Sequence, residues 1–218
     1  MTNMVTIDGP TSSGKNSVGF LLAKKLGYQY IDTGMIYRAG SYLVLKNNVS
    51  LDDIEGIIAV FRNLNINIRS DEDGLRISNN GEDLTDFIHS GPVTKNVPVI
   101  AAIKGVREAT KVLQRELGEV RDSVMTGRDI GSEIFPDAKC KFFLTATPEV
   151  RAQRRYEQLK KDPGITYQQV YQSILDRDEK DTNREISPLR IPVGAVVIDN
   201  SNLTVEQTVD KILNLCTN

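Results

Sequence analysis

The sequence has no tryptophan, a single histidine and only two cysteines among its 218 residues. Cys140 and Cys216 lie far apart and have no metal-ligand spacing, so we expect two reduced structural thiols. His89 alone builds neither a zinc site nor a serine–histidine nucleophile, and we expect it at a surface or a helix end. Chemistry must then depend on Lys, Arg, Asp and backbone groups, which favours phosphoryl transfer.

Neither charge sign is in excess, and no long apolar run is present. Lys and Arg number 27 and Asp and Glu 29, a formal net charge of −2 that argues against general nucleic-acid binding. No apolar stretch approaches the roughly 20 residues that span a bilayer, and the start MTNMVTIDGP does not resemble a signal peptide. We expect a soluble cytoplasmic monomer, with neither nucleic acid nor membrane as partner.

Strands and helices alternate along most of the chain. Apolar runs predict strands over 4–8, 28–32, 123–126, 141–144 and 195–198. Helical periodicity predicts helices over 15–26, 33–46, 51–62 with Ser50 as N-cap, 148–160, 166–184 and 205–215, with 91–120 helical in two pieces that divide near Lys104. This order favours a doubly wound parallel sheet. Period-two alternation and turn signals within 64–85 predict a small inserted antiparallel sheet.

Residues 9–15, GPTSSGK, match the phosphate-binding loop pattern G-x-x-x-x-G-K, and they lie between the first predicted strand and the first predicted helix. Such a loop turns successive backbone N–H groups towards one anion, and the helix N-terminus adds partial positive charge. Lys15 supplies a mobile ammonium for β- and γ-phosphates. The nucleotide-binding residues that this pattern predicts are Gly9, Pro10, Thr11, Ser12, Ser13, Gly14, Lys15, Asn16 and Ser17.

One position departs from the general G-x-x-x-x-G-K-[ST] pattern. The residue after Lys15 is Asn16 instead of Ser or Thr, and Ser17 stands one place later. We therefore assign the magnesium-directed hydroxyl to Ser17, acting through a bound water.

The predicted helix over 166–184 carries a stripe that begins apolar and ends charged. Val170 and Ile174 share a helix face with Arg177, Asp181 and Arg184. The charged end either forms an intramolecular ladder of ion pairs or faces a polar ligand, and the pattern alone does not decide between them.

Four segments together resemble bacterial cytidylate kinases over nearly the whole chain. They are IDGPTSSGKNS, YIDTGMIYRA, GRDIGSEIFPDAKCKFFLTATPEVRAQRR, and DRDEKDTNREISPL followed by VVIDNSNLT. The resemblance implies a P-loop fold in one domain over 1–218. Its core covers 1–62 and 91–218 with a five-stranded parallel sheet, an insert over about 63–90 closes over CMP, and a helical lid covers about 148–187. It implies transfer of a phosphoryl group from ATP, with Mg²⁺, to CMP or dCMP.

The resemblance also implies roles for individual residues. Lys15, Arg128 and Arg184 would be catalytic. Asp129 and Arg107 would contact the cytosine ring, and Asp181 the sugar. The full set of CMP-binding residues implied is Thr33, Arg38, Arg107, Arg128, Asp129, Arg177, Asp181 and Arg184. Arg151, Arg154 and Arg155, at helical spacing, resemble lid arginines that close over the transferring phosphate.

Two further departures bear on the site. Thr126 stands where many family members have an acidic residue before Gly-Arg-Asp, which weakens any metal assignment to that strand end. Pro98 replaces a serine near the cytosine and removes one contact to the base.

Two alternative functions stay open. The chain could phosphorylate another small acceptor, such as UMP or a non-nucleotide. It could instead be a regulatory nucleotide switch, although it has no N-K-x-D guanine motif.

Overall fold

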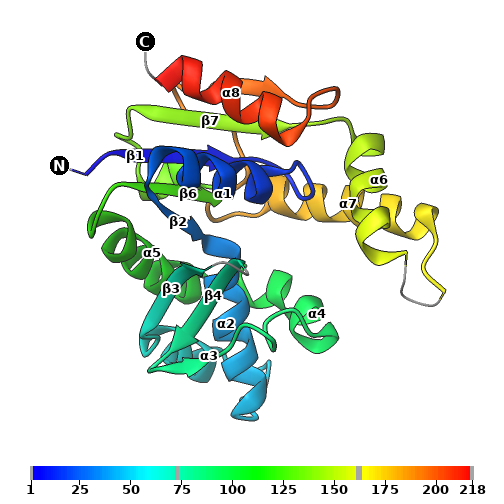
Figure 1. Ribbon diagram of the computed structural model, residues 1–218. Helices are drawn as coiled ribbons and strands as arrows, with labels where there is room; N and C mark the ends of the chain where they lie inside the picture. Colours follow the sequence, from blue (N-terminus) through cyan, green and yellow to red (C-terminus); the bar gives the residue numbers. More distant parts are fainter. Residues whose placement is uncertain (1, 72–73, 161–163, 217–218) are drawn as a thin grey trace. The chain divides into compact units, whose positions relative to one another are not determined.

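The computed structural model of the protein describes residues 2–71, 74–160 and 164–216. Residues 72–73 of the expected turn and 161–163 of the expected lid lie outside this description. The chain divides into two compact units (Figure 1). We call residues 3–28 with 124–218 the P-loop unit, and residues 29–123 with Thr2 the central unit.

The P-loop unit alternates strands and helices, as the sequence predicts. Its strands are β1 (Met4–Asp8), β6 (Ser123–Gly127, whose first residue counts with the central unit), β7 (Cys140–Thr145) and β8 (Val196–Asp199). Its helices are α1 (Lys15–Leu26), α6 (Pro148–Leu159), α7 (Tyr167–Asn183) and α8 (Val205–Cys216), with a π-helical turn, η1 (Ile130–Ile134). The sequence did not predict η1.

The central unit contains the remaining elements. Its helices are α2 (Thr33–Lys46), α3 (Ile54–Arg62), α4 (Gly91–Ile100) and α5 (Lys104–Glu119). Its strands are β2 (Gln29–Asp32), β3 (Ile66–Asp71), β4 (Gly74–Asn79) and β5 (Glu82–Asp83). The two ends of the unit meet, because the Gln29 N–H donates to the Asp122 carbonyl at 2.9 Å and Arg121 Nε donates to Gln29 Oε1 at 3.1 Å.

Two sheets organise the chain. The five-stranded sheet has the order β2-β6-β1-β7-β8, with β7 parallel to both β1 and β8. The three-stranded sheet has the order β3-β4-β5, and its β3–β4 and β4–β5 pairs are antiparallel. The predicted α/β class, with a parallel sheet and a separate small antiparallel sheet, is confirmed.

Buried apolar side chains form the core of the P-loop unit. All five residues of β1 are buried, and Leu22 of α1 and Phe142 of β7 are almost fully enclosed. Val170 and Ile174 of α7 pack with Ala152 of α6 in a separate small cluster. The apolar half of the α7 stripe is therefore a packing surface, as its periodicity predicts.

One predicted helix start was wrong. The sequence favoured a helix from Leu51 with Ser50 as its N-cap, but α3 begins at Ile54 with Asp53 as the cap. The Asp53 carboxylate accepts the Gly56 N–H at 2.9 Å, whereas Ser50 Oγ accepts only the Asp52 N–H at 3.3 Å. Aspartate and serine are comparable N-caps, so local sequence did not distinguish the two starts.

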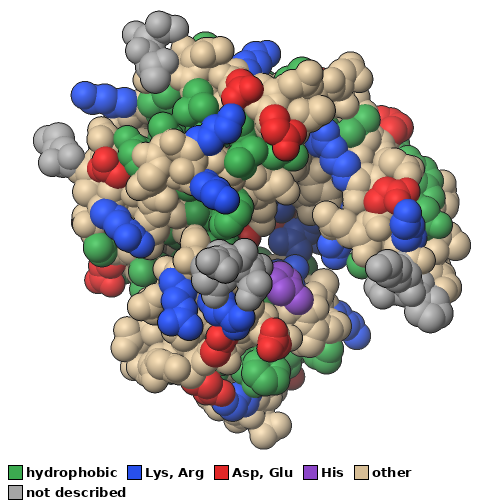
Figure 2. All heavy atoms as spheres, in the orientation of Figure 1, with side chains coloured by type: hydrophobic (Ala, Val, Ile, Leu, Met, Phe, Trp, Pro, Cys, Tyr) green, Lys and Arg blue, Asp and Glu red, His purple; other side chains and the backbone are tan. Residues whose placement is uncertain are grey.

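The surface agrees with the near-neutral composition. On the face shown in Figure 2, Lys and Arg side chains are interspersed with Asp and Glu in the region of α1 and α8. Among the described residues, no helix has the length and apolar character that crossing a membrane requires.

Candidate active site

The phosphate loop joins β1 to α1 by a backbone path that depends on glycine. A Cβ at Gly9 would lie 2.1 Å from the Leu144 carbonyl oxygen, so no side chain fits there. Gly14, the N-cap residue of α1, has a φ of 86°, a left-handed conformation that glycine adopts without strain. No side chain caps this helix end. A helix N-terminus of this kind, with its N–H groups and positive dipole end, favours an anion.

Lys15 lies at the first position of α1 with its side chain folded over the loop. The residue is 7% exposed, and Nζ donates to the Pro10 carbonyl at 3.0 Å. Asn16 and Ser17 follow it and are exposed. The ammonium is thus held beside the same backbone that would surround a phosphate.

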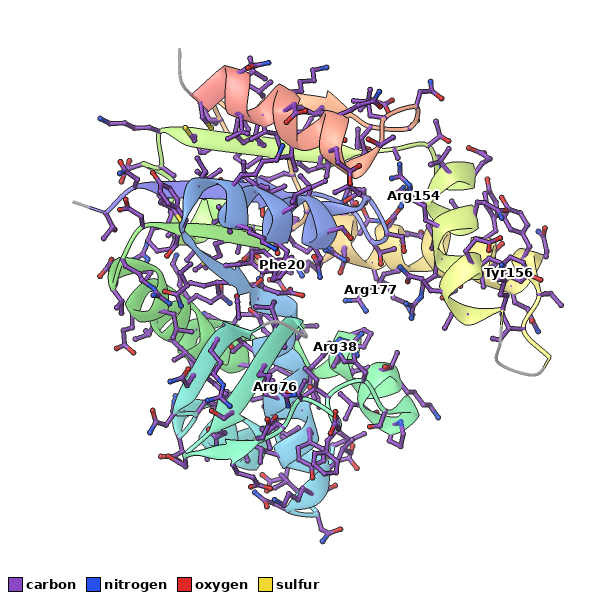
Figure 3. The ribbon with its side chains drawn as sticks, in the orientation of Figure 1. Phe20, Arg38, Arg76, Arg154, Tyr156 and Arg177 are labelled. Carbon is purple, nitrogen blue, oxygen red and sulfur yellow. The ribbon has the colours of Figure 1, made fainter. Side chains whose placement is uncertain are left out.

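Asn200 and Arg154, which lie far from the phosphate loop in the sequence, donate hydrogen bonds to its backbone. Asn200 Nδ2 donates to the Ser13 carbonyl at 3.0 Å. Arg154 donates to the same carbonyl at 3.3 Å and to the Asn200 backbone and side-chain oxygens at 2.8 and 3.1 Å. Figure 3 shows Arg154 beside α6, in the middle of which it lies. Sequence reasoning did not select Asn200, although its place directly after β8 was a signal.

The other two predicted lid arginines have different surroundings. Arg151 is 4% exposed, donates to the Thr11 carbonyl at 3.2 Å and to the Ala146 carbonyl at 2.9 Å, and forms an ion pair with Asp178 at 2.5 Å. Arg155 is only partly buried and donates to Gln158 at 3.0 Å. Arg151 and Arg154 therefore contact phosphate-loop carbonyls, and Arg155 has a neighbour on its own helix.

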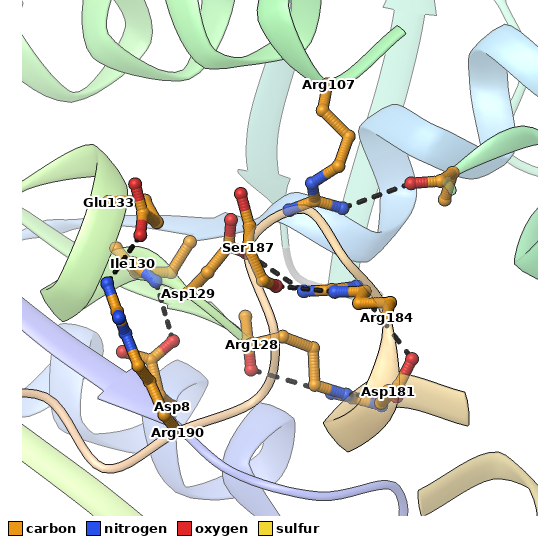
Figure 4. Close-up of polar contacts among 12 residues, drawn as sticks. Asp8, Arg107, Arg128, Asp129, Ile130, Glu133, Asp181, Arg184, Ser187 and Arg190 are labelled. Atoms are coloured by element: carbon orange, nitrogen blue, oxygen red, sulfur yellow. Dashed lines mark hydrogen bonds and ion pairs between the residues drawn. The ribbon is translucent and has the colours of Figure 1, made fainter. Parts of the chain in front are cut away.

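Arginines surround a buried carboxylate at the end of α7 (Figure 4). Asp181 accepts from Arg128 Nε at 2.9 Å and pairs with Arg184 Nη1 at 3.9 Å, and Figure 4 labels all three residues. It also pairs with Arg177 Nε at 3.3 Å. Arg184 follows the helix as its C-cap residue in extended conformation, so the predicted last helical residue was wrong by one. Its Nε donates to the Ser187 carbonyl, within a bend that returns the Leu189 N–H to the Asp181 carbonyl at 2.7 Å.

The electrostatics of this cluster keep Asp181 ionised. Burial of the carboxyl group raises its pKa, but the positive charges of Arg128, Arg177 and Arg184 outweigh that effect and hold the pKa below its usual value. Arg184 also lies 3.8 Å from Asp129. Three guanidinium groups thus face two carboxylates, and the excess positive charge suits a further anion.

Asp129 stands at the turn after β6. It is 5% exposed and occupies the N-cap position of η1 without a side-chain capping bond, and Arg128 stands immediately before it. Asp8, at the end of β1, accepts the Ile130 N–H at 2.8 Å and the Gly131 N–H at 2.7 Å. Sequence reasoning missed Asp8, and its only signal was a carboxylate inside a buried strand.

Thr33 and Arg38 lie on α2 of the central unit. Thr33 is the first helical residue and is 4% exposed, and the Asp32 carboxylate caps the helix by accepting the Gly34 N–H at 2.9 Å. Arg38 donates to the Ile88 carbonyl at 3.2 Å and to Thr94 Oγ1 at 3.0 Å. These bonds hold the guanidinium group of Arg38 against the start of α4.

Arg107 of the same unit is buried on α5. It donates to the Ala101 carbonyl at 3.1 Å, and its guanidinium carbon lies 5.5 Å from the centre of the Tyr37 ring. Pro98 lies inside α4 and is partly buried. Arg107 is therefore anchored by a backbone acceptor and an aromatic face.

The residues fit a magnesium ion that arrives with its nucleotide. Within the described ranges, no group of three or more His, Cys, Asp or Glu is arranged to hold a metal. Magnesium in phosphoryl-transfer sites keeps several waters and takes oxygens from substrate phosphates, so few protein ligands are needed. The exposed hydroxyl of Ser17, on the first turn of α1, is compatible with such a site.

Sequence comparison gives one family. A family model described as "Cytidylate kinase" matches residues 5–218. A cytidylate kinase of Caldanaerobacter subterraneus subsp. tengcongensis is 44% identical over 213 residues, which are 97% of this chain and 93% of the relative. The cytidylate kinase of Bacillus subtilis is 40% identical over 210 residues, covering 96% of this chain and 94% of the relative.

Solved structures of lower identity share the fold. A shikimate kinase from Bacteroides thetaiotaomicron superposes with a TM-score of 0.51 at 15% identity and covers both chains fully. One from Acinetobacter baumannii, in complex with shikimate, has a TM-score of 0.53 at 18% identity and covers 100% of this chain and 94% of its own. Given the family model that matches residues 5–218 and the cytidylate kinases of 40–44% identity over nearly the whole chain, the chain belongs to the cytidylate kinase family.

Proposed function

We propose that the protein transfers a phosphoryl group reversibly from ATP to CMP or dCMP. The observation that carries this proposal is the presence in one compact unit of an anion-binding loop with a held lysine and of an arginine cluster with excess positive charge. The reaction brings two phosphate groups together, so both features have a use. The family to which the chain belongs agrees with this reaction.

Catalysis in this proposal is electrostatic. The acceptor is already a phosphate oxygen, so no general base is required. Lys15 and the N–H groups at the start of α1 bind the donor phosphates, while Arg128 and Arg184 neutralise charge that develops on the transferring group. Preorganised charges of this kind need little rearrangement during the reaction, which is why buried and anchored arginines suit the role.

Asp181, Asp129 and Arg177 would act on CMP within the P-loop unit. Asp181 keeps acceptor capacity beyond its arginine partners, because an ionised carboxylate has about four lone-pair sites, and it would accept from a sugar hydroxyl. Asp129 would accept the amino group of cytosine. Arg177, whose side chain is 30% exposed, would contact phosphate.

Thr33, Arg38 and Arg107 of the central unit would also contact CMP. A hydroxyl at the first position of α2 is placed for an anion at a helix N-terminus, and a guanidinium group suits a phosphate in a fork. Arg107 would contact the cytosine ring. We assign no base contact to Pro98, which has neither a hydroxyl nor a backbone N–H.

The remaining assignments complete the proposal. Magnesium would accompany ATP, with Ser17 contacting it through water, and its charge would stabilise the phosphates. The segment 148–187 would act as a lid through Arg151, Arg154 and Arg155, and about 63–90 as the CMP-binding insert. We propose a cytoplasmic monomer that does not act on nucleic acid.

A steady-state assay against the four nucleoside monophosphates tests the function. With ATP and magnesium, kcat/KM for CMP or dCMP should exceed that for UMP, AMP and GMP by at least tenfold. Preference for UMP would replace the proposal with the uridylate alternative. Hydrolysis of nucleotide without any acceptor preference would support the regulatory switch instead.

A further inference from the structure

Asp8 is a buried carboxylate that the proposed reaction does not use. It is the last residue of β1, is 0% exposed, and lies directly before the phosphate loop. Its two oxygens accept two successive backbone N–H groups. One comes from Ile130 at 2.8 Å (Figure 4), and the other from Gly131 at 2.7 Å. Both oxygens therefore serve one short segment of backbone.

The segment that Asp8 holds begins immediately after Arg128 and Asp129. Arg128 Nε binds the Asp181 carboxylate at 2.9 Å, and Asp129 lies 3.8 Å from Arg184. The fixed N–H groups are thus one and two residues beyond Asp129. A shift of this turn would move both side chains together.

Ionising the buried carboxyl group of Asp8 costs free energy, and the two hydrogen bonds to Ile130 and Gly131 offset part of that cost. Burial raises the pKa of the carboxyl group to about 6, although the two hydrogen bonds lower it. Among the charged neighbours, Asp129 raises this pKa further and Lys15 lowers it. Only an ionised carboxylate offers acceptors on both oxygens, whereas an amide or a carboxylic acid offers one acceptor and one donor group.

We propose that Asp8 is a positioning residue, whose paired hydrogen bonds to residues 130 and 131 hold Arg128 and Asp129 in the geometry that binds the acceptor nucleotide. This inference rests on the proposed function for the identity of that nucleotide. According to this inference, Asp8 affects binding of the acceptor nucleotide and not binding of ATP, although Asp8 directly precedes the loop assigned to ATP. A purely structural role would change stability, or both substrates alike.

The substitution Asp8→Asn tests the difference, because it keeps the shape but turns an NH₂ group towards one of the two N–H groups. We expect KM for CMP to rise at least tenfold while KM for ATP changes by less than about threefold. Thr6→Val is the matched control. Thr6 is also fully buried in β1, and its hydroxyl would lie 2.8 Å from a Cβ on Gly131. Thr6→Val should leave KM for CMP and KM for ATP within about twofold of the wild-type values.

Other outcomes overturn the inference. Equal increases in both KM values, or a folded Asp8→Asn enzyme with unchanged KM for CMP, would make Asp8 a structural residue only. If the wild type prefers another monophosphate, the proposed function fails, and the same comparison is made with that acceptor. A wild type without a CMP preference contradicts the proposed function, whereas an Asp8→Asn enzyme with unchanged acceptor KM contradicts the inference about Asp8. The two failures are therefore distinguishable.

A pH profile provides a second readout that also works if Asp8→Asn does not fold. The phosphate of CMP itself titrates near pH 6. If Asp8 must also be ionised, log(kcat/KM) for CMP in the wild type falls with a slope approaching two below pH 6, and in Asp8→Asn with a slope of one. A wild-type slope of one would overturn the inference without any variant.

Discussion

Lys15 illustrates how one residue's contacts define its expected role. Its ammonium is held at 3.0 Å from the Pro10 carbonyl inside the phosphate loop. In Lys15→Ala we expect kcat to fall by about 100-fold or more, because a charged transition-state contact contributes roughly 3 kcal/mol. Lys25→Ala, on the same helix but paired at the surface with Asp210, is the control and should be close to wild type. Near-normal turnover of folded Lys15→Ala would contradict the loop assignment.

Asp129 tests base recognition. A carboxylate accepts from the cytosine amino group and repels the uracil carbonyl, so Asp129→Asn should narrow the ratio of kcat/KM values for CMP and UMP. The expected change is a few kcal/mol, since the wrong base leaves a buried group unpaired. Glu133→Gln, in the adjacent η1 turn, should leave the ratio unchanged. An unchanged ratio in Asp129→Asn would remove Asp129 from the base-binding residues.

The raised pKa of Asp8 predicts a pH dependence of stability. In the unfolded chain an aspartate titrates near 4, whereas in the folded protein the pKa is about 6. The folded state therefore binds the proton more tightly, so Asp8's contribution is greatest below pH 4 and is lost as pH rises through 6. Between pH 4 and pH 7 the wild type should lose about 2 kcal/mol relative to Asp8→Asn, measured by urea unfolding. A pH-independent difference would contradict the burial effect.

At the scale of elements, α6 and α7 are joined by a buried ion pair as well as by apolar packing. Arg151 and Asp178 lie 2.5 Å apart, and the Arg151 side chain is 5% exposed. Arg151→Ala leaves Asp178 without this partner, and we expect a loss of about 3 kcal/mol in the free energy of unfolding. Arg155→Ala, one turn further along α6, should cost less than about 1 kcal/mol. Similar losses in the two variants would show that the pair does not stabilise this helix contact.

Element type was predictable from sequence wherever the apolar period was clear. The bounds of α2 and the C-cap of α1 at Gly27 follow from local signals that the structure retains. The start of α3 was not predictable, because Ser50 and Asp53 are both good caps and the chain uses the second. The η1 turn depends on Asp8, a partner more than a hundred residues away that no local pattern reveals.

The candidate site was predictable in its residues but not in their contacts. Motifs selected Lys15, Arg128 and Asp181 because phosphate chemistry needs those groups at those spacings. That Arg151 and Arg154 contact loop carbonyls depends on how α6 packs against the loop, which spacing does not specify. Asn200 went unselected for the same reason.

For the whole molecule, ligand binding should appear as stability. A ligand that binds only the folded state at 100 times its Kd adds about 2.7 kcal/mol. For a chain of 218 residues this corresponds to an increase in Tm of about 5–10 °C with CMP. UMP at the same concentration should give a smaller increase, measured by scanning calorimetry. Equal increases would show that the folded protein does not distinguish the two bases.

The meeting of Gln29 with Asp122 has a consequence for how such a chain changes over evolution. The central unit leaves the rest of the sequence and returns to it at neighbouring residues. A segment whose ends lie together can be lengthened, shortened or exchanged at the level of the gene while the flanking chain keeps its path. The acceptor contacts proposed for Thr33, Arg38 and Arg107 can therefore diversify within this one segment, while the phosphate loop, which precedes it in the sequence, stays constant.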